Sequence, residues 1–286
     1  MRYAVRTTWL FAALFAGTAG AQTPPPEPPA TSEIVVTGRV ALTRDEARTF
    51  TNSISVPIDR QLARLGVTAC PRAIGFPPAI AAEIEARIRA VASAIELPVG
   101  KADCRGNIAI IGVDDGAGLV RALEKTQSPL VYGLPSALLG RLRTMQAPAR
   151  AWSLVELQNE DGIPGLTPIG AWWANLEVRR ASYLAPPTQQ AIQFSVVVLE
   201  WPALPGKTTT QIADYVAMRT FARTRPASGT GKVGTILSLF EPDATPPPSM
   251  TATDLAYLRA LYARSAPQYA RQQVREIAAS LEKASQ

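Results

Sequence analysis

Two cysteines, Cys70 and Cys104, enclose the most regular segment of the chain, and this arrangement constrains the fold more than any other feature. Between them, apolar residues recur at spacings of three and four: Ile80, Ile84, Ile88, Val91 and Ile95. This spacing predicts a single helix with one apolar face, ended by Pro98. On the opposite face, acidic and basic residues four apart predict two solvent-exposed ion pairs, Glu83 with Arg87 and Glu85 with Arg89.

The chain contains no other cysteine, so Cys70 and Cys104 have only each other as bonding partners. In an oxidising compartment, two cysteines in an exported domain predict a disulfide. The alternative is a catalytic thiol, which is disfavoured because the chain has no histidine to activate it. We expect a disulfide that stabilises the fold by roughly 4 kcal/mol, since it constrains the unfolded chain.

The first residues indicate export. Arg2 and Arg6 precede the apolar run "WLFAALFAG", and small residues follow at Ala19 and Ala21. This pattern predicts a signal peptide over residues 1–21, cleaved between Ala21 and Gln22. The apolar run is too short for a permanent anchor, and no second long apolar run follows, so no membrane span is predicted. The expected location is the periplasm or the medium.

Residues 22–32 contain "QTPPPEPPAT", which predicts an extended proline-rich linker. Residues 33–42 follow, and their segment "EIVVTGRV", Glu33 to Val40, resembles the TonB box found near the N-terminus of TonB-dependent outer-membrane transporters. An extended segment behind a linker could add a strand to a partner's sheet. The alternatives are the first strand of the domain or a tail without a role.

Residues 43–286 carry the periodic segments of one domain. Helices are predicted after the capping box "TRDE" at Thr43, at "LVRALEK", from Thr208, at "TATDLAYLRALY" and from about Pro267. Strands are predicted at residues 107–113, 151–158 and 191–201. This order predicts a single α+β domain with a mixed sheet flanked by helices.

Composition excludes several classes of function. The formal charge is +6, but the longest basic cluster is Arg179–Arg180, so we expect no nucleic-acid partner. Without histidine, the Ser-His-Asp and Cys-His mechanisms and an H-E-x-x-H zinc site are impossible. Two cysteines alone cannot complete a zinc site, and no metal or cofactor is predicted.

Carboxylates are the remaining candidates for chemistry. Asp114 and Asp115 follow the strand at residues 107–113, where α/β proteins often place ligand contacts. The alternative is a turn and N-cap for the next helix. Asp254 occupies the fourth position of "TATD", which predicts a role in helix initiation.

The helix from Thr208 carries Asp214, Tyr215 and Arg219 on an otherwise apolar surface. Tyr215 and Arg219 are four apart and share a face, so Arg219 could stack on the tyrosine ring or reach an acid elsewhere. The alternative is an ordinary helix with solvated charges. We expect a partly buried role, with Arg219 bound to a carboxylate or to backbone carbonyls.

Five ordered segments carry a resemblance: "QLARLGVTACPRAIGFP", "CRGNIAIIGVDDG", "QIADYVAMRTFARTRP", "ILSLFEP" and "MTATDLAYLRALY". They resemble, from about Ile54 to Tyr262, an uncharacterised family of exported proteins of Gram-negative bacteria. The C-terminal half is also similar to a bacterial domain of unknown function with a zinc-peptidase-like outline. This second resemblance places "ADYVA" at the H-E-x-x-H position, so Ala213 and Ala217 would replace the metal ligands and Asp214 the general base.

These observations favour a non-catalytic periplasmic or envelope-associated binding protein on a peptidase-like scaffold that has lost its metal site. Its partner would be an envelope component or a small ligand, and the candidate ligand-binding residues are Asp214, Tyr215, Arg219, Asp114 and Asp115. The alternative is a histidine-free hydrolase that uses carboxylates on cell-envelope glycan or peptide. Two carboxylates about 5 to 10 Å apart in a cleft would favour that alternative.

Overall fold

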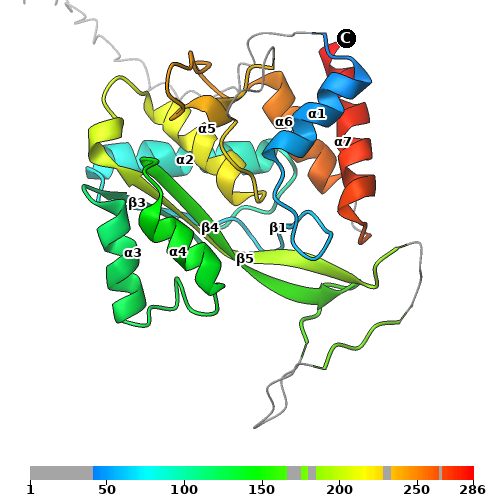
Figure 1. The fold of residues 1–286 in the computed structure, drawn as a ribbon, viewed down its shortest axis with the longest axis horizontal. Helices are drawn as coiled ribbons and strands as arrows, with labels where there is room; N and C mark the ends of the chain where they lie inside the picture. Colours follow the sequence, from blue (N-terminus) through cyan, green and yellow to red (C-terminus); the bar gives the residue numbers. More distant parts are fainter. Residues whose placement is uncertain (1–40, 166–174, 180–184, 228–232, 264–265) are drawn as a thin grey trace, which may run out of the picture. The chain divides into compact units, whose positions relative to one another are not determined.

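The computed structural model describes residues 41–165, 175–179, 185–227, 233–263 and 266–286. These residues belong to one compact unit, in which helices pack on both faces of a sheet (Figure 1). The predicted signal peptide, the proline-rich linker and the segment from Glu33 to Val40 lie outside the described residues.

The described residues form seven α-helices: α1 (Arg44–Ile54), α2 (Pro78–Ala94), α3 (Gly116–Lys125), α4 (Ser136–Thr144), α5 (Thr209–Thr220), α6 (Ala252–Tyr262) and α7 (Ala270–Ser285). Capping boxes open α1, α5 and α6 at Thr43, Thr208 and Thr251. Helix α4 was not predicted, because it is short and its N-cap, Pro135, provides no side-chain hydrogen bond. Within the described ranges, no helix is both long enough and apolar enough to cross a bilayer.

The sheet has five strands in the described residues: β1 (Arg64–Leu65), β2 (Pro71–Ile74), β3 (Ile108–Val113), β4 (Ala149–Asn159) and β5 (Thr188–Glu200). Strand β5 is central, with β1 and β3 parallel to it on one side and β4 antiparallel on the other. Strand β2 extends the sheet in parallel beyond β3, which leaves β4 as the opposite edge. The predicted mixed sheet flanked by helices is therefore confirmed.

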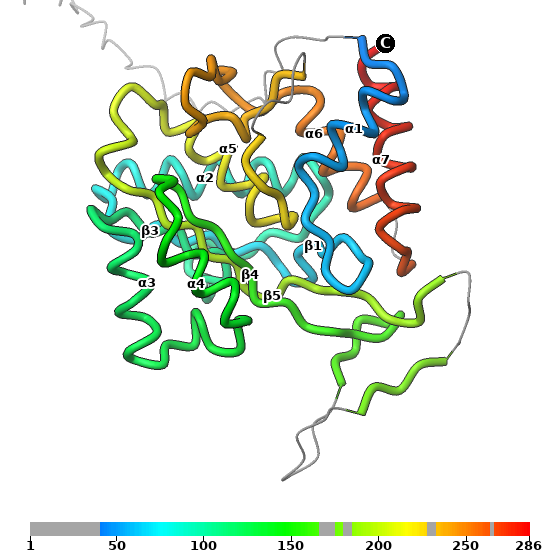
Figure 2. Tube along the Cα trace, in the orientation of Figure 1, coloured from blue at the N-terminus to red at the C-terminus, as the bar shows by residue number. Residues whose placement is uncertain are grey.

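Alternate residues of the central strands enter two separate cores. Ile108 and Ile110 of β3 belong to a large core with α2 and α5, whereas Ala109 belongs to a smaller core with α3 and α4. The continuous apolar run of β3 follows from this burial on both faces. Figure 2 shows α2 and α5 on one side of the sheet and α3 and α4 on the other. Helices α1, α6 and α7 pack together and extend the large core.

The predicted disulfide between Cys70 and Cys104 is confirmed. Cys70 directly precedes β2, and its backbone N–H donates to the Asn107 side chain at 2.9 Å. The bond therefore fixes the start of β2 to the segment before β3, with α2 in the loop between them. Strand β2 was not predicted, because its four residues are too few for a periodic signal.

Candidate functional site

Helix α5 carries three of the predicted site residues and is buried along most of its length. The Thr208 hydroxyl accepts a hydrogen bond from the Gln211 backbone N–H at 3.1 Å, and the Gln211 side chain accepts one from the Thr208 N–H at 3.0 Å. Every residue from Ile212 to Thr220 is buried. The alternative of a helix with solvated charges is therefore excluded.

Asp214 is fully buried and forms a bidentate pair with Arg87 of α2. Arg87 Nε donates to Oδ1 at 2.7 Å and Nη2 donates to Oδ2 at 3.0 Å. The Met250 backbone N–H also donates to Oδ2, at 2.6 Å. The predicted surface pair of Arg87 with Glu83 is therefore wrong, because a buried carboxylate on α5 takes the guanidinium instead. This pair joins two helices of the large core, which is a structural role.

Tyr215 and Arg219 share a face of α5, as their spacing predicted. Arg219 Nη1 donates a hydrogen bond to the Tyr215 hydroxyl, and the guanidinium carbon lies 5.4 Å from the centre of the tyrosine ring. The ring packs edge-on against Phe240 at 4.9 Å. Burial raises the pKa of the Tyr215 hydroxyl, and the positive charge of Arg219 opposes this shift. The hydroxyl is therefore a neutral partner for Arg219 at physiological pH.

The prediction that Arg219 binds a carboxylate or backbone carbonyls is wrong. Its hydrogen-bond partner is a phenol, and its Nε is buried without a partner among the described residues. The residue is only 7% exposed, so this donor cannot be satisfied by bulk water. An unsatisfied buried donor costs about 1 to 3 kcal/mol, and more when the group is charged.

Asp114 and Asp115 lie elsewhere, at the end of β3. Asp115 is the N-cap of α3, where its carboxylate accepts from the Gly118 N–H at 2.7 Å and pairs with Arg121 at 3.2 Å. The turn-and-cap alternative therefore describes Asp115. Asp114 is exposed. Asp254, the other predicted capping residue, accepts a hydrogen bond from the Thr251 hydroxyl at 3.0 Å.

The carboxyl ends of β3 and β5 are filled by side chains. Glu200 accepts hydrogen bonds from Arg150 Nη1 at 2.5 Å and from the Gly116 N–H at 3.0 Å. The rings of Phe76 and Trp201 pack 4.9 Å apart beside them. The aspartates at the end of β3 make no hydrogen bond or ion pair with the site residues of α5 in the described structure. The five predicted residues are thus divided between two places.

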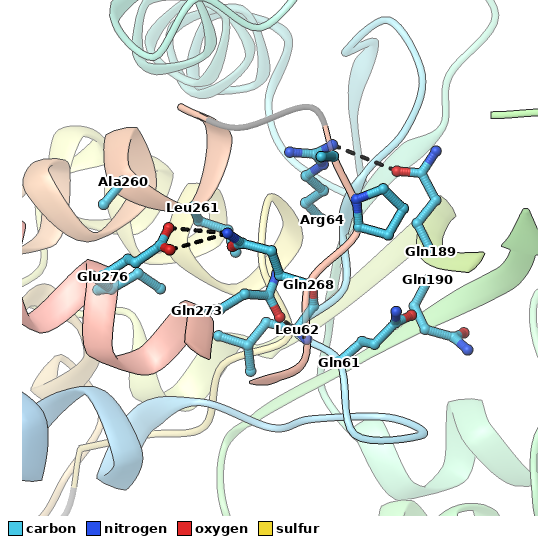
Figure 3. Close-up of a pocket in the computed structure, with 13 residues that line it drawn as sticks. Gln61, Leu62, Arg64, Gln189, Gln190, Ala260, Leu261, Gln268, Gln273 and Glu276 are labelled. Atoms are coloured by element: carbon cyan, nitrogen blue, oxygen red, sulfur yellow. Dashed lines mark hydrogen bonds between the residues drawn. The ribbon is translucent and has the colours of Figure 1, made fainter. Parts of the chain in front are cut away.

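One polar cavity has room for bound water. Glutamine side chains from three parts of the chain converge on it, including Gln61, Gln189 and Gln273 (Figure 3). Its volume is about 30 Å³, more than the roughly 10 to 15 Å³ that a cavity needs to hold a water molecule. The Gln61 Oε1 atom is buried there without a protein partner among the described residues. This cavity suits a bound water and is too small for a larger ligand.

An open groove of about 1230 Å³ passes over the disulfide and the end of α2. Charges of both signs line it, with Arg64, Arg105 and Arg259 alongside Glu96 and Asp161. Asp161 also pairs with Arg179. Such a mixed lining favours no particular ligand charge, so the groove carries a weaker functional argument than its size suggests.

A third cavity, which we term the arginine pocket, lies at the edge strand β4 between α4 and the segment that follows α5. Its volume is about 320 Å³. Four arginines line it: Arg141, Arg219, Arg223 and Arg225. The other described residues that line it are uncharged: Val56, Leu138, Leu142, Met145, Ala151, Trp152, Ser153, Thr224 and Pro226. No carboxylate is present among these lining residues.

The four guanidinium groups range from the interior of the protein to the rim. Arg219 is buried, Arg223 is half-buried, and Arg141 and Arg225 are exposed. Burial lowers the pKa of Arg223, and the nearby positive charge of Arg141 lowers it further. Arg225 donates to the Ser55 backbone carbonyl at 2.9 Å. The side chains of Arg141 and Arg223 make no hydrogen bond or ion pair with the described residues.

This arrangement suits an anion. Guanidinium groups donate hydrogen bonds and accept none, and their planar geometry matches the oxygen atoms of carboxylates and phosphates. Positive charges that are partly buried without counter-ions carry a desolvation cost, which a bound anion would offset. The described lining residues therefore offer guanidinium donors that can bind an anion.

Sequence reasoning identified Arg219 but missed the other three arginines. A signal was present in "MRTFARTRP", where Arg219, Arg223 and Arg225 recur within seven residues. Arg141 comes from α4, which lies far earlier in the chain and was not predicted as a helix. Only the fold brings it to the same cavity.

In comparisons with protein-family models, curated proteins and solved structures, the chain has no match.

Proposed function

We propose that the protein is a non-catalytic binding protein of the bacterial cell envelope, and that it holds an anionic ligand in the arginine pocket. The observation that carries this proposal is the uncompensated charge of the pocket. Arg219 has a buried Nε without a partner in the described structure, and Arg223 and Arg141 lie close together without a carboxylate. A fold keeps such groups at a cost in stability, which is typical of functional sites.

The envelope location rests on two features. The N-terminal segment has the pattern of a cleavable signal peptide. The bond between Cys70 and Cys104 would persist in the periplasm or medium and be rare in the reducing cytosol. Together they support an exported protein that meets its ligand outside the cytoplasm.

The peptidase-like scaffold remains part of the proposal. In it, α5 would be a former catalytic helix that now packs, with Ala213 and Ala217 at the positions of the metal ligands. Both alanines are fully buried in the large core, together with Asp214. Arg219, at the far end of the same helix, would supply the new binding function.

The hydrolase alternative has weaker support. Asp214 is held by Arg87 and the Met250 N–H, and Asp115 caps α3 and pairs with Arg121. A catalytic acid or base needs access to a substrate proton, and neither carboxylate lines one of the cavities described above. Binding is therefore the function that this geometry supports best.

The proposal is tested by calorimetric titration with small anions, namely inorganic phosphate, sulfate and a short-chain carboxylate, at constant ionic strength. Wild type should bind at least one of them, and the variant R219Q/R223Q should bind it at least tenfold more weakly. The matched control is R48Q, because Arg48 is an exposed arginine of α1 outside the pocket. Failure of wild type to bind any of the anions, or an equal loss in R48Q, would refute the proposal.

A further inference from the structure

The geometry points to a phosphate group as the anion, carried by a ligand whose remaining part is small and apolar or by free phosphate itself. This inference rests on the proposed function and names the chemical class that the arginine pocket selects. Two properties of the pocket favour phosphate over a carboxylate, namely the number of hydrogen-bond donors and the density of positive charge, and its apolar wall indicates what the rest of the ligand is like.

Donors far outnumber acceptors in the pocket. Arg141 and Arg223 have all their N–H groups free of partners in the described structure. The Thr224 hydroxyl donates to the Met218 carbonyl at 2.8 Å, which leaves its oxygen as a minor acceptor. A carboxylate offers two oxygen atoms, whereas a phosphate monoester offers three strong acceptors on one centre. The larger acceptor set fits donors that come from α4, from α5 and from the segment after α5.

The positive charges are crowded as well as numerous. Arg141 of α4 is near enough to Arg223 for repulsion to affect the protonated form of Arg223. Arg219 of α5, which is buried, lines the same pocket. A singly charged ligand would leave most of this repulsion in place, whereas a phosphate monoester brings a charge of about −1.5 to −2 at neutral pH.

An apolar wall faces the arginines. Trp152 of β4 and Leu142 of α4 are buried, and Leu138 and Met145 pack beside them. The cavity volume of about 320 Å³ lies at the lower end of the range of roughly 300 to 1,000 Å³ for ligand pockets. This space suits a phosphate group with a few carbon atoms, and it is small for a nucleotide.

The charged groups that line the described part of the pocket are all guanidinium groups. They are Arg141 from α4, Arg219 from α5, and Arg223 and Arg225 from the segment after α5, while β4 contributes none. Arg219 contacts the Tyr215 hydroxyl, whose pKa is raised by burial, lowered by the charge and hydrogen bond of Arg219, and raised slightly by the charge of Glu241. Any pH dependence of binding between pH 5.5 and 8 should therefore come from the ligand.

The test is calorimetric titration of the full exported chain with butyl phosphate, pentanoate and inorganic phosphate. Butyl phosphate should bind at least tenfold more tightly than pentanoate at pH 7.5. Its affinity should fall several-fold at pH 5.5, because the second pKa of a phosphate monoester is about 6. Pentanoate, with a carboxyl pKa near that of glutamate at about 4.3, should bind with little change over this range.

Inorganic phosphate separates the two sources of the group. Tighter binding of butyl phosphate supports an ester as the ligand, and equal or tighter binding of inorganic phosphate supports free phosphate. The variant R141Q, at the exposed rim, should weaken phosphate binding severalfold, and R48Q should leave it unchanged. R141Q keeps the test usable even if variants at Arg219 fail to fold.

Pentanoate binding as tight as butyl phosphate, or phosphate affinity that is constant from pH 5.5 to 7.5, would overturn the phosphate inference and leave an anion-binding protein. Binding of none of the three probes would overturn the inference. If sulfate also fails to bind, the proposed function fails with it.

Discussion

Asp214 and Arg87 are separated by 127 positions in the sequence and meet as a bidentate pair inside the large core. Buried pairs of this kind add little net stability, but removal of one partner leaves the other charge buried alone. The Met250 N–H would lose its acceptor as well. Asp214 therefore contributes to the fold, although the sequence placed it among ligand-binding candidates.

We predict that D214A lowers the free energy of unfolding by about 3 to 5 kcal/mol. The matched control is D114A, because Asp114 is exposed and should change stability by no more than about 0.5 kcal/mol. Urea denaturation of both variants provides the measurement. If D214A also stays within about 0.5 kcal/mol of wild type, the buried pair does not have the role described here.

The buried tyrosines predict a loss of stability at alkaline pH. Burial raises the pKa of Tyr257 to about 12 from its usual value of 10.0, opposed by a hydrogen bond with Ser55. The folded state holds this proton more tightly than the unfolded state does. The contribution of Tyr257 to the free energy of unfolding is therefore fully present below pH 10 and is lost as pH rises from 10 to 12.

We predict that Tyr257 accounts for about 2 kcal/mol of the stability lost between pH 9 and pH 11.5. Urea denaturation at the two pH values should show a smaller loss in Y257F than in wild type, by about that amount. The other tyrosines are present in both proteins, so their contribution largely cancels, and the charge of Tyr257 is the smallest of the causes that act on the pKa of Tyr262. Equal losses of stability in Y257F and wild type would contradict the assignment of this loss to Tyr257.

At the scale of the element, a helix or strand could be predicted from the sequence where its own segment carries a recognisable pattern. The capping boxes at Thr43 and Thr251 correctly predicted the starts of α1 and α6, and the predicted threonine cap of α5 is Thr208. The apolar run of β3 predicted a strand buried on both faces, because such strands do not alternate.

The missed elements are those without a local signal. Strand β1 has two residues and β2 has four, so their pairing with β5 and β3 depends on the rest of the sheet. The site was missed for a related reason. Arg141 and Arg223 belong to different parts of the chain, and only the fold brings them together. In the same way, Arg87 was predicted to pair with Glu83 on its own helix, but the fold brings it to Asp214.

Removal of the disulfide tests how much the covalent connection across the loop that contains α2 contributes to stability. We predict that the free energy of unfolding of the double variant C70S/C104S is about 2 to 5 kcal/mol lower than that of wild type. Reductant should lower the stability of wild type by a similar amount and have no effect on the double variant. Thiol titration of the denatured, unreduced exported protein should find no free sulfhydryl, and two free thiols would contradict both the bond and the expected compartment.

At the scale of the whole molecule, the arginine pocket exists because two layers of helices meet at one edge of the sheet. Helix α4 belongs to the smaller core and supplies Arg141, whereas α5 belongs to the large core and supplies Arg219. Strand β4 lies between them and pairs only with β5 among the strands of the described residues. The pocket is therefore lined by residues of an edge strand of the described sheet and by Arg219 at the buried end of α5.

The central claim is that these arginines are kept for binding and not for stability. The most direct test is the free energy of unfolding of wild type and R223M, measured by urea denaturation with and without the tightest-binding anion. Without the anion, R223M should be as stable as wild type or slightly more stable, because the substitution removes a partly buried, unpaired charge beside Arg141. With the anion at about 100 times its Kd, wild type should gain about 2.7 kcal/mol, and R223M should gain clearly less. A variant that is destabilised in both conditions and gains as much from the anion as wild type would contradict the account.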